Sequence, residues 1–189
     1  MIRLDIDIER KILMKVLFVI DVQNDFVTEP LGTKEAQAAI PNIVNKIREF
    51  DGYVVVTMDT HYDDYPKTLE GKKLPIPHCK MGTAGRNLPN DVWEVIKCKK
   101  EYAIYSKNTF GTFEYINELN FIHRNEVPIH KIEIVGFCTD ICVISNALIL
   151  RAAFPNIPIE VDAKCCAGVT PELHEAALKV MKSCQIDVI

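Results

Sequence analysis

The sequence has no hydrophobic run of the roughly 20 residues that are needed to cross a lipid bilayer. Its first fourteen residues, MIRLDIDIERKILM, alternate charged side chains with isoleucine, so they also lack the apolar centre of a signal peptide. These two absences predict a cytoplasmic protein without a membrane partner.

Clusters of positive charge are absent as well. The chain carries 22 Lys and Arg residues against 26 Asp and Glu residues, a net charge of -4, and its lysines are scattered. Binding to a nucleic-acid backbone needs a concentrated basic surface, so nucleic acid is excluded as an expected partner. The glycine patterns of dinucleotide sites and P-loops, G-x-G-x-x-G and G-x-x-x-x-G-K-[ST], do not open any expected helix.

Cysteine is present, but without the even and regular spacing of a disulfide framework. The 189-residue chain is 48% hydrophobic, which suffices for the core of one domain without covalent cross-links. We therefore expect free thiols in a reducing compartment. The seven cysteines are Cys79, Cys98, Cys138, Cys142, Cys165, Cys166 and Cys184.

Short apolar runs alternate along the chain with segments of helical periodicity. The runs KVLFVID and YVVVTMD are continuous and end in a carboxylate, which is typical of buried parallel strands. The pattern predicts an α/β fold with a doubly wound, mostly parallel sheet flanked by helices. Residues 1–14 are expected to form an N-terminal extension and residues 15–189 a single domain. Strands are expected at 15–21, 53–59, 102–107, 131–137, 157–161 and 186–189, and helices at 34–50, 91–98, 112–122, 140–154 and 170–183.

Residues at the expected strand ends have the chemistry of a nucleophilic site. In such a sheet, ligands bind beyond the carboxyl ends of the strands. Cys142 lies near the expected start of a helix, where the helix dipole and Lys107 are expected to lower its pKa and make it a nucleophile. Asp21 can accept the thiol proton, and the backbone N–H groups of Cys138 and Cys142 can form an oxyanion hole. Spacing alone leaves open the alternative that both cysteines only pack in the core.

Residue types that bind metals occur in and beside the segment 60–91, which is rich in Pro, Gly, Lys and Asp and has no periodicity. Asp59 and His61 are two positions apart at a strand end, so their side chains can point in one direction. Glu70 and His78 lie in the segment and can return to them. Mixed nitrogen and oxygen ligands predict one divalent ion, zinc first, with manganese or iron as alternatives. On spacing alone, the alternative of solvated loop residues stays open.

Four segments together resemble a known family. FVIDVQNDF, YSKNTF and GFCTDICV are similar, in order and spacing, to the three catalytic segments of the isochorismatase-like cysteine hydrolases. DTH followed by LPIPHCKMGTAG resembles the metal-binding half of the nicotinamidases within that superfamily. The resemblance runs from about Lys15 to the C-terminus and implies the three-layer fold of the family.

The resemblance also implies roles for individual residues. The sequence departs from the family pattern at Cys138, where the family usually has a small residue. The catalytic residues would be Asp21, Lys107 and Cys142, and the amides of Cys138 and Cys142 would form the oxyanion hole. The metal ligands would be Asp59, His61 and His78, with Glu70 a ligand in only some members. Phe26 matches an aromatic residue that flanks the substrate ring.

The expected function follows from the same resemblance. It implies an amidohydrolase for a small-molecule amide, one that converts nicotinamide to nicotinic acid and ammonia in NAD salvage. The protein is also expected to be a homo-oligomer. An alternative on the same residues is the hydrolysis of another small amide, ureido or vinyl-ether substrate. A third possibility is a metal-binding or protein-interaction module in which the catalytic residue types are incidental.

Overall fold

The computed structural model describes residues 13–28 and 30–189. The expected extension, residues 1–14, lies largely outside the described residues, and Met14 is the first residue of the first strand. Within the described ranges, no helix combines the length and the apolar composition that a membrane span requires.

The strands are β1 (Met14–Ile20), β2 (Tyr53–Asp59), β3 (Tyr102–Lys107), β4 (Ile129–Phe137), β5 (Ile159–Ala167) and β6 (Asp187–Val188). The α-helices are α1 (Asn24–Val27), α2 (Lys34–Glu49), α3 (Leu69–Lys73), α4 (Asn90–Ile96), α5 (Glu114–Asn125), α6 (Ile144–Ala153) and α7 (Pro171–Ser183).

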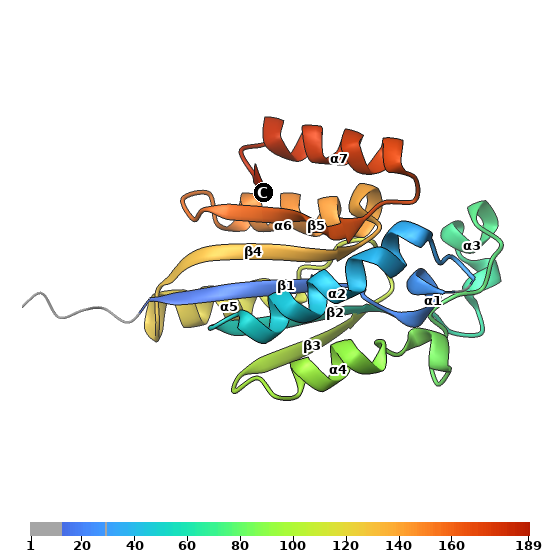
Figure 1. The fold of residues 1–189 in the computed structure, drawn as a ribbon, viewed down its shortest axis with the longest axis horizontal. Helices are drawn as coiled ribbons and strands as arrows, with labels where there is room; N and C mark the ends of the chain where they lie inside the picture. Colours follow the sequence, from blue (N-terminus) through green and yellow to red (C-terminus); the bar gives the residue numbers. More distant parts are fainter. Residues whose placement is uncertain (1–12, 29) are drawn as a thin grey trace, which may run out of the picture.

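The strands form a parallel sheet, which in the described part of the chain has the order β3-β2-β1-β4-β5-β6. From β1 the chain moves outward to β2 and β3, and it then returns to β4 on the other side of β1. The strand order therefore reverses between β1 and β4, and ligands bind at such a reversal, beyond the carboxyl ends of the strands. Helices α1 and α3 lie at that end of the sheet (Figure 1). The expected doubly wound fold is confirmed.

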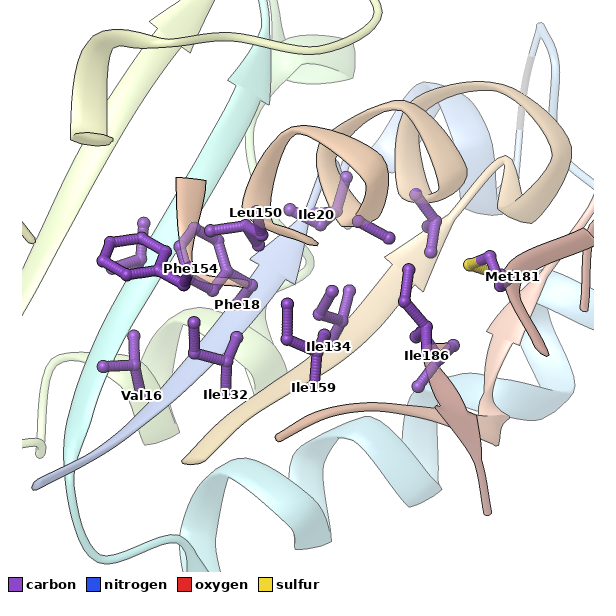
Figure 2. Close-up of a cluster of buried hydrophobic side chains, with 14 of the residues drawn as sticks. Val16, Phe18, Ile20, Ile132, Ile134, Leu150, Phe154, Ile159, Met181 and Ile186 are labelled. Carbon is purple, nitrogen blue, oxygen red and sulfur yellow. The ribbon is translucent and has the colours of Figure 1, made fainter. Parts of the chain in front are cut away.

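Helices cover both faces of the sheet and give the fold three layers (Figure 1). Helices α5, α6 and α7 pack on one face, and α2 and α4 pack on the other. Strand β1 is buried on both sides, because Val16, Phe18 and Ile20 face the first layer whereas Leu17 and Val19 face the second. This double burial explains the continuous apolar run in the sequence. Figure 2 shows the side chains of the first cluster, among them Ile132, Ile134, Leu150, Phe154, Ile159, Met181 and Ile186.

Strands β1 and β4 approach each other very closely near their carboxyl ends. Gly136 has φ of +142°, and a Cβ atom at this position would lie 2.1 Å from the carbonyl oxygen of Ile20. Only glycine combines this backbone conformation with the absence of a side chain. Asp21 directly follows β1 and Cys138 directly follows β4, so the two residues lie at the same end of neighbouring parallel strands.

Apart from the unexpected short helix α1 and small shifts at element ends, three segments differ from the sequence-based prediction. The helix expected from residue 140 begins with a π-helical turn, Thr139–Val143, and α6 follows this turn. The segment 60–91, expected to be irregular, contains α3 and short 3-10 turns at Tyr65–Lys67 and Ala84–Arg86. Strand β5 continues to Ala167 instead of ending at 161, because its end still pairs with β4 although polar residues interrupt the apolar pattern.

Candidate functional site

Of the residues expected at the strand ends, Asp59, Cys138 and Cys142 line one cavity. It has a volume of about 350 Å³ and a mostly apolar wall. Asp21 directly follows β1, Asp59 ends β2 and Lys107 ends β3, so the parallel sheet delivers them to the same edge. The lining residues include Phe26, Asp59, Glu70, His78, Cys138 and Cys142.

Lys107 contacts both Asp21 and Cys142. Its Nζ atom lies 2.5 Å from Oδ2 of Asp21 and 3.7 Å from Sγ of Cys142. All three residues are buried, with exposed fractions of 0% for Asp21 and 5% for each of the other two. The structure thus gathers the three residues expected to be catalytic around a single amine.

The position of Asp21 is fixed by its backbone and by Thr57. Asp21 has φ of 49°, in a region that non-glycine residues rarely occupy and that is enriched at functional sites. Its N–H donates to the carbonyl of Thr57 at 3.1 Å, and the Thr57 hydroxyl donates to Oδ1 of Asp21 at 2.7 Å. Oδ2 is left to face Lys107. Thr57 could not be identified from the sequence, because it lies within an apolar strand that gives no signal of a polar role.

Burial and neighbouring charges set the protonation of this group. Burial alone would lower the pKa of Lys107, but the Asp21 carboxylate, together with Cys142 and Asp59, outweighs this effect and keeps the pKa above its ordinary value, so the amine is charged. Burial raises the pKa of the Cys142 thiol well above its usual range, and Asp21 adds to the rise while Lys107 opposes it. The expectation of a lowered Cys142 pKa is therefore wrong. Burial, together with the Asp21 carboxylate, outweighs the opposing charge of Lys107.

Cys142 is held in the π-helical turn that follows Cys138. The carbonyl of Cys138 accepts the N–H of Val143 at 3.2 Å, and Cys138 itself is left-handed with φ of 55°. The turn is anchored from outside, since the Asp140 carboxylate accepts the N–H of Val169 at 2.9 Å. A π-helical turn locally widens a helix, and such turns are frequent at functional sites.

Asp59, His61 and His78 form a second cluster with Glu70 at its rim. Oδ2 of Asp59 lies 3.0 Å from Nε2 of His61 and 3.3 Å from Nε2 of His78. Oε1 of Glu70 is 3.6 Å from each of these two nitrogens. Potential ligand atoms of Asp59, His61 and His78 all lie within 4.8 Å of one another. The structure therefore brings together all four residues expected to bind a metal.

The donor set of this cluster fits a divalent metal ion. Among the described residues, the buried Nε2 of His61 makes no hydrogen bond of good geometry although Oδ2 of Asp59 is 3.0 Å away, as expected where side chains converge on a common ion rather than on one another. Nδ1 of His78 contacts the carbonyl oxygen of Ile76 at 2.9 Å, which orients Nε2 toward the cluster. Burial alone would raise the pKa of Asp59, but the two histidines and the charge of Lys107 together keep it below its ordinary value, so the carboxylate is ionised as a ligand must be. Two imidazoles with carboxylates suit zinc, manganese or iron.

The segment 60–91 reaches this cluster because its later part runs alongside His61. The N–H of His61 donates to the carbonyl of Cys79 at 3.0 Å, and the carbonyl of His61 accepts from Met81 at 2.8 Å. This short bridge places His78 beside His61. The Asp25 carboxylate accepts the N–H of Cys79 at 2.7 Å and so supports the left-handed turn there.

Two further side chains of FVIDVQNDF contribute to the site. The Gln23 side-chain oxygen accepts the N–H of Asp59 at 2.7 Å, and its amide donates to the carbonyls of Asp59 and Arg86, each at 2.8 Å. Sequence reasoning missed Gln23, although a polar residue directly after a buried strand is a usable signal. Phe26, expected to flank the substrate, lines the cavity, and its ring centroid lies 5.7 Å from that of His78.

Known proteins share both the sequence pattern and the fold. A family model described as the isochorismatase domain matches residues 15–189. The nicotinamidase/pyrazinamidase of Mycobacterium tuberculosis is 27% identical over 191 residues, covering 93% of this chain and 98% of the relative. A probable inactive nicotinamidase of Arabidopsis thaliana is 28% identical over 181 residues, covering 88% and 87%. The crystal structure of a nicotinamidase from Bacillus subtilis matches with a TM-score of 0.77 at 29% identity, covering 93% of this chain and 99% of the other. The resemblance inferred from the four sequence segments is confirmed.

Proposed function

This chain belongs to the isochorismatase family, and on that premise we propose that it is a nicotinamidase, an amidohydrolase that converts nicotinamide to nicotinic acid and ammonia. One observation carries the proposal. Cys142 and three residues of the metal-type cluster, Asp59, Glu70 and His78, line the same cavity. A nucleophile and a ligand-binding cluster that share a cavity can hold an aromatic amide with its carboxamide beside the sulfur.

In the proposed reaction, Asp21 is the general base and Cys142 is the nucleophile. As the sulfur attacks the carboxamide carbon, the thiol proton passes to Asp21, and the charge of Lys107 stabilises the developing thiolate. The substrate oxygen becomes an oxyanion that accepts hydrogen bonds from the amides of Cys138 and Cys142. The C–N bond then breaks, Asp21 returns the proton to the amine, and ammonia leaves a thioester on Cys142. Water gives a proton to Asp21 as it attacks the thioester; nicotinic acid leaves, and the proton returns to the sulfur.

Asp59, His61 and His78, with Glu70 as a further oxygen donor, are the residues that would hold a divalent ion, zinc before manganese or iron. A bound ion would supply a positive charge and an open coordination position for the ring nitrogen of nicotinamide. Phe26, whose ring lies against His78, would pack on the pyridine ring.

A comparison of nicotinamide with benzamide tests the proposal, because benzamide has the same shape but no ring nitrogen. Steady-state ammonia release is measured with zinc-supplemented enzyme, with and without a chelator. We expect kcat/KM to be at least about a hundredfold higher for nicotinamide, the effect of a contact worth roughly 3 kcal/mol. The chelator and the substitution His61→Ala should each reduce this preference for nicotinamide. The preference is expected to come from the cluster of Asp59, His61 and His78 and not from Cys142.

Equal rates for the two amides in the zinc-supplemented enzyme would contradict the nicotinamide assignment. Release from neither amide would favour the alternative of another small amide or a ureido substrate on the same residues. A Cys142 thiol without any reactivity toward amides would favour a metal-binding or interaction module. A role in NAD salvage, a cytoplasmic location and a homo-oligomeric state stay predictions from the sequence.

A further inference from the structure

Asn146 lies in α6, one helical turn after Cys142, and its side chain is completely buried. Its Nδ2 atom donates to the carbonyls of Cys142 at 2.8 Å and Phe110 at 3.2 Å. Its Oδ1 atom accepts the N–H of Thr112 at 3.2 Å and the hydroxyl of Tyr115 at 2.8 Å. A primary amide has two N–H donors and two acceptor lone pairs, so every hydrogen-bonding position of Asn146 is used.

Two of these bonds hold residues 108–113, which we call the Phe110 segment. It joins Lys107 at the end of β3 to the start of α5. The Phe110 side chain lines the cavity that contains Cys142, and it also lines an adjoining cavity of about 510 Å³ that contains His61. Because this side chain is 48% exposed, its own packing holds it only partly. The position of this wall of the pocket therefore depends on the backbone of the Phe110 segment.

The Phe110 segment lies directly on α6. A Cβ atom at Gly111 would sit 2.7 Å from Cδ1 of Ile149 and 3.2 Å from Cβ of Ser145. The bonds from Asn146 to the carbonyl of Phe110 and the N–H of Thr112 flank this point of closest approach on both sides. Asn146 thus determines where the Phe110 segment rests on the helix.

We propose that Asn146 is a positioning residue that fixes the Phe110 wall of the substrate pocket relative to the Cys142 nucleophile. One amide joins the backbone of the nucleophile to the backbone of the wall, so the width of the pocket between them is set by Asn146. The identity of the substrate in this inference rests on the proposed function, but Asn146 itself contacts no reacting atom. A displaced wall would weaken the binding of the substrate and of the transition state by similar amounts, so KM should change more than kcat.

A double-mutant cycle of Asn146→Ala and Phe110→Ala tests this coupling with nicotinamide as substrate. Asn146→Ala should raise KM at least about tenfold with a smaller change in kcat. In the Phe110→Ala background the same substitution should change KM little, because the side chain that Asn146 positions is absent. Tyr115→Phe is the matched control: it removes one bond to Asn146 but leaves both bonds to the Phe110 segment.

Additive effects in the cycle, or a KM increase in Tyr115→Phe equal to that in Asn146→Ala, would overturn the proposal. If Asn146→Ala does not fold, Asn146→Ser takes its place. A serine hydroxyl can still donate to the carbonyl of Cys142 one helical turn earlier, but it is too short to reach the Phe110 segment, and the same KM increase is expected.

Hydrogen exchange separates this inference from the proposed function. In Asn146→Ala, the amides of the Phe110 segment should exchange at least about tenfold faster than in the wild type, while those of β1 and β4 stay protected. Tyr115→Phe should leave the exchange of the segment unchanged. A wild type that releases no ammonia would contradict the proposed function without affecting this measurement. Unchanged exchange in the Phe110 segment of Asn146→Ala would overturn the role of Asn146, whatever the activity.

Discussion

At the scale of single residues, the buried charge pair of Asp21 and Lys107 has the largest expected energetic effect. The pair is 2.5 Å apart, and both side chains are almost inaccessible to water. Desolvation offsets much of the attraction in such a pair, so its presence adds little net stability, whereas removing one partner leaves an uncompensated buried charge. A thiol in contact with the pair can ionise only when its proton has an acceptor. Ionisation of the Cys142 thiol therefore requires both members of the pair, Asp21 and Lys107.

Lys107→Met should separate stability from activity. It leaves Asp21 charged and buried, so the free energy of unfolding should fall by about 3–5 kcal/mol. The double variant Asp21→Asn, Lys107→Met removes both charges and should recover much of that loss, yet neither variant should release ammonia from nicotinamide. Urea unfolding followed by circular dichroism measures the stabilities. A double variant less stable than Lys107→Met would contradict the interpretation that the loss in Lys107→Met comes from the uncompensated buried charge of Asp21.

Gly136 gives a second prediction at this scale. Gly136→Ala forces a Cβ atom to within 2.1 Å of the Ile20 backbone oxygen. We expect it to lower the free energy of unfolding by at least about 3 kcal/mol, the sum of backbone strain and steric overlap. Gly82 is the control, since it has φ of +81° and no atom within 4 Å of its Cβ position. Gly82→Ala should lower stability by only about 1 kcal/mol. Equal losses in the two variants would argue against the close approach of β1 and β4.

The sequence was informative about residues whose role depends on their place at a strand end. Asp21, Asp59 and Lys107 follow apolar runs, so a parallel sheet brings them to one edge. Asn146 was not predictable, because its role depends on contacts with a segment more than thirty positions away in the chain. The protonation of Cys142 was mispredicted for a related reason: proximity to a helix start is visible in the sequence, but the depth of burial is not.

At the scale of elements, a network of ion pairs joins α2 to β4. Nζ of Lys46 lies 2.6 Å from Oε2 of Glu133, and Nζ of Lys131 lies 3.3 Å from Oε1 of the same carboxylate. Burial alone would raise the pKa of Glu133, but the hydrogen bond and the charge of Lys46, together with Lys131, outweigh it and hold the pKa below its ordinary value. A carboxylate with a lowered pKa in the folded state stabilises the fold above its unfolded pKa.

The pH dependence of stability tests this network. The contribution of Glu133 should be fully present above its ordinary pKa of 4.5 and should be lost as the pH falls through its lower folded-state value. We therefore expect the wild type to be more stable than Glu133→Gln near neutral pH, with the difference shrinking as the pH falls below about 4. Chemical unfolding of both proteins across this range gives the difference. A difference that is independent of pH would exclude the ion pair as its source.

The elements themselves were predictable where their patterns were long. Strands β1 and β2 were recognised as continuous apolar runs, and the capped start of α7 at Thr170 and Pro171 was visible in the sequence. The helix within the segment 60–91 was not predictable, because α3 has five residues, too few for a helical periodicity to appear. The π-helical turn at Thr139–Val143 was read as an ordinary helix start, since nothing in its residue types marks the wider turn.

At the scale of the whole molecule, the site exists only because the sheet is assembled in its doubly wound order. The residues proposed to act on one substrate span positions 21 to 142 and come from the ends of β1, β2, β3 and β4 together with the segment 60–91. The isochorismatase family shares this fold, but one relative with 28% identity is described as a probable inactive nicotinamidase. Family membership therefore does not by itself establish turnover, and the chemistry has to be measured on this chain.

Ammonia release from nicotinamide by the wild type, Cys142→Ala and Cys138→Ala is the most direct test that Cys142 is the nucleophile of an amidohydrolase. Cys142→Ala removes the sulfur and little volume, so it should stay folded and lose at least about a thousandfold in kcat. Cys138→Ala keeps its backbone N–H and should stay active. Turnover by Cys142→Ala near the wild-type rate, or equal losses in the two variants, would contradict the assignment.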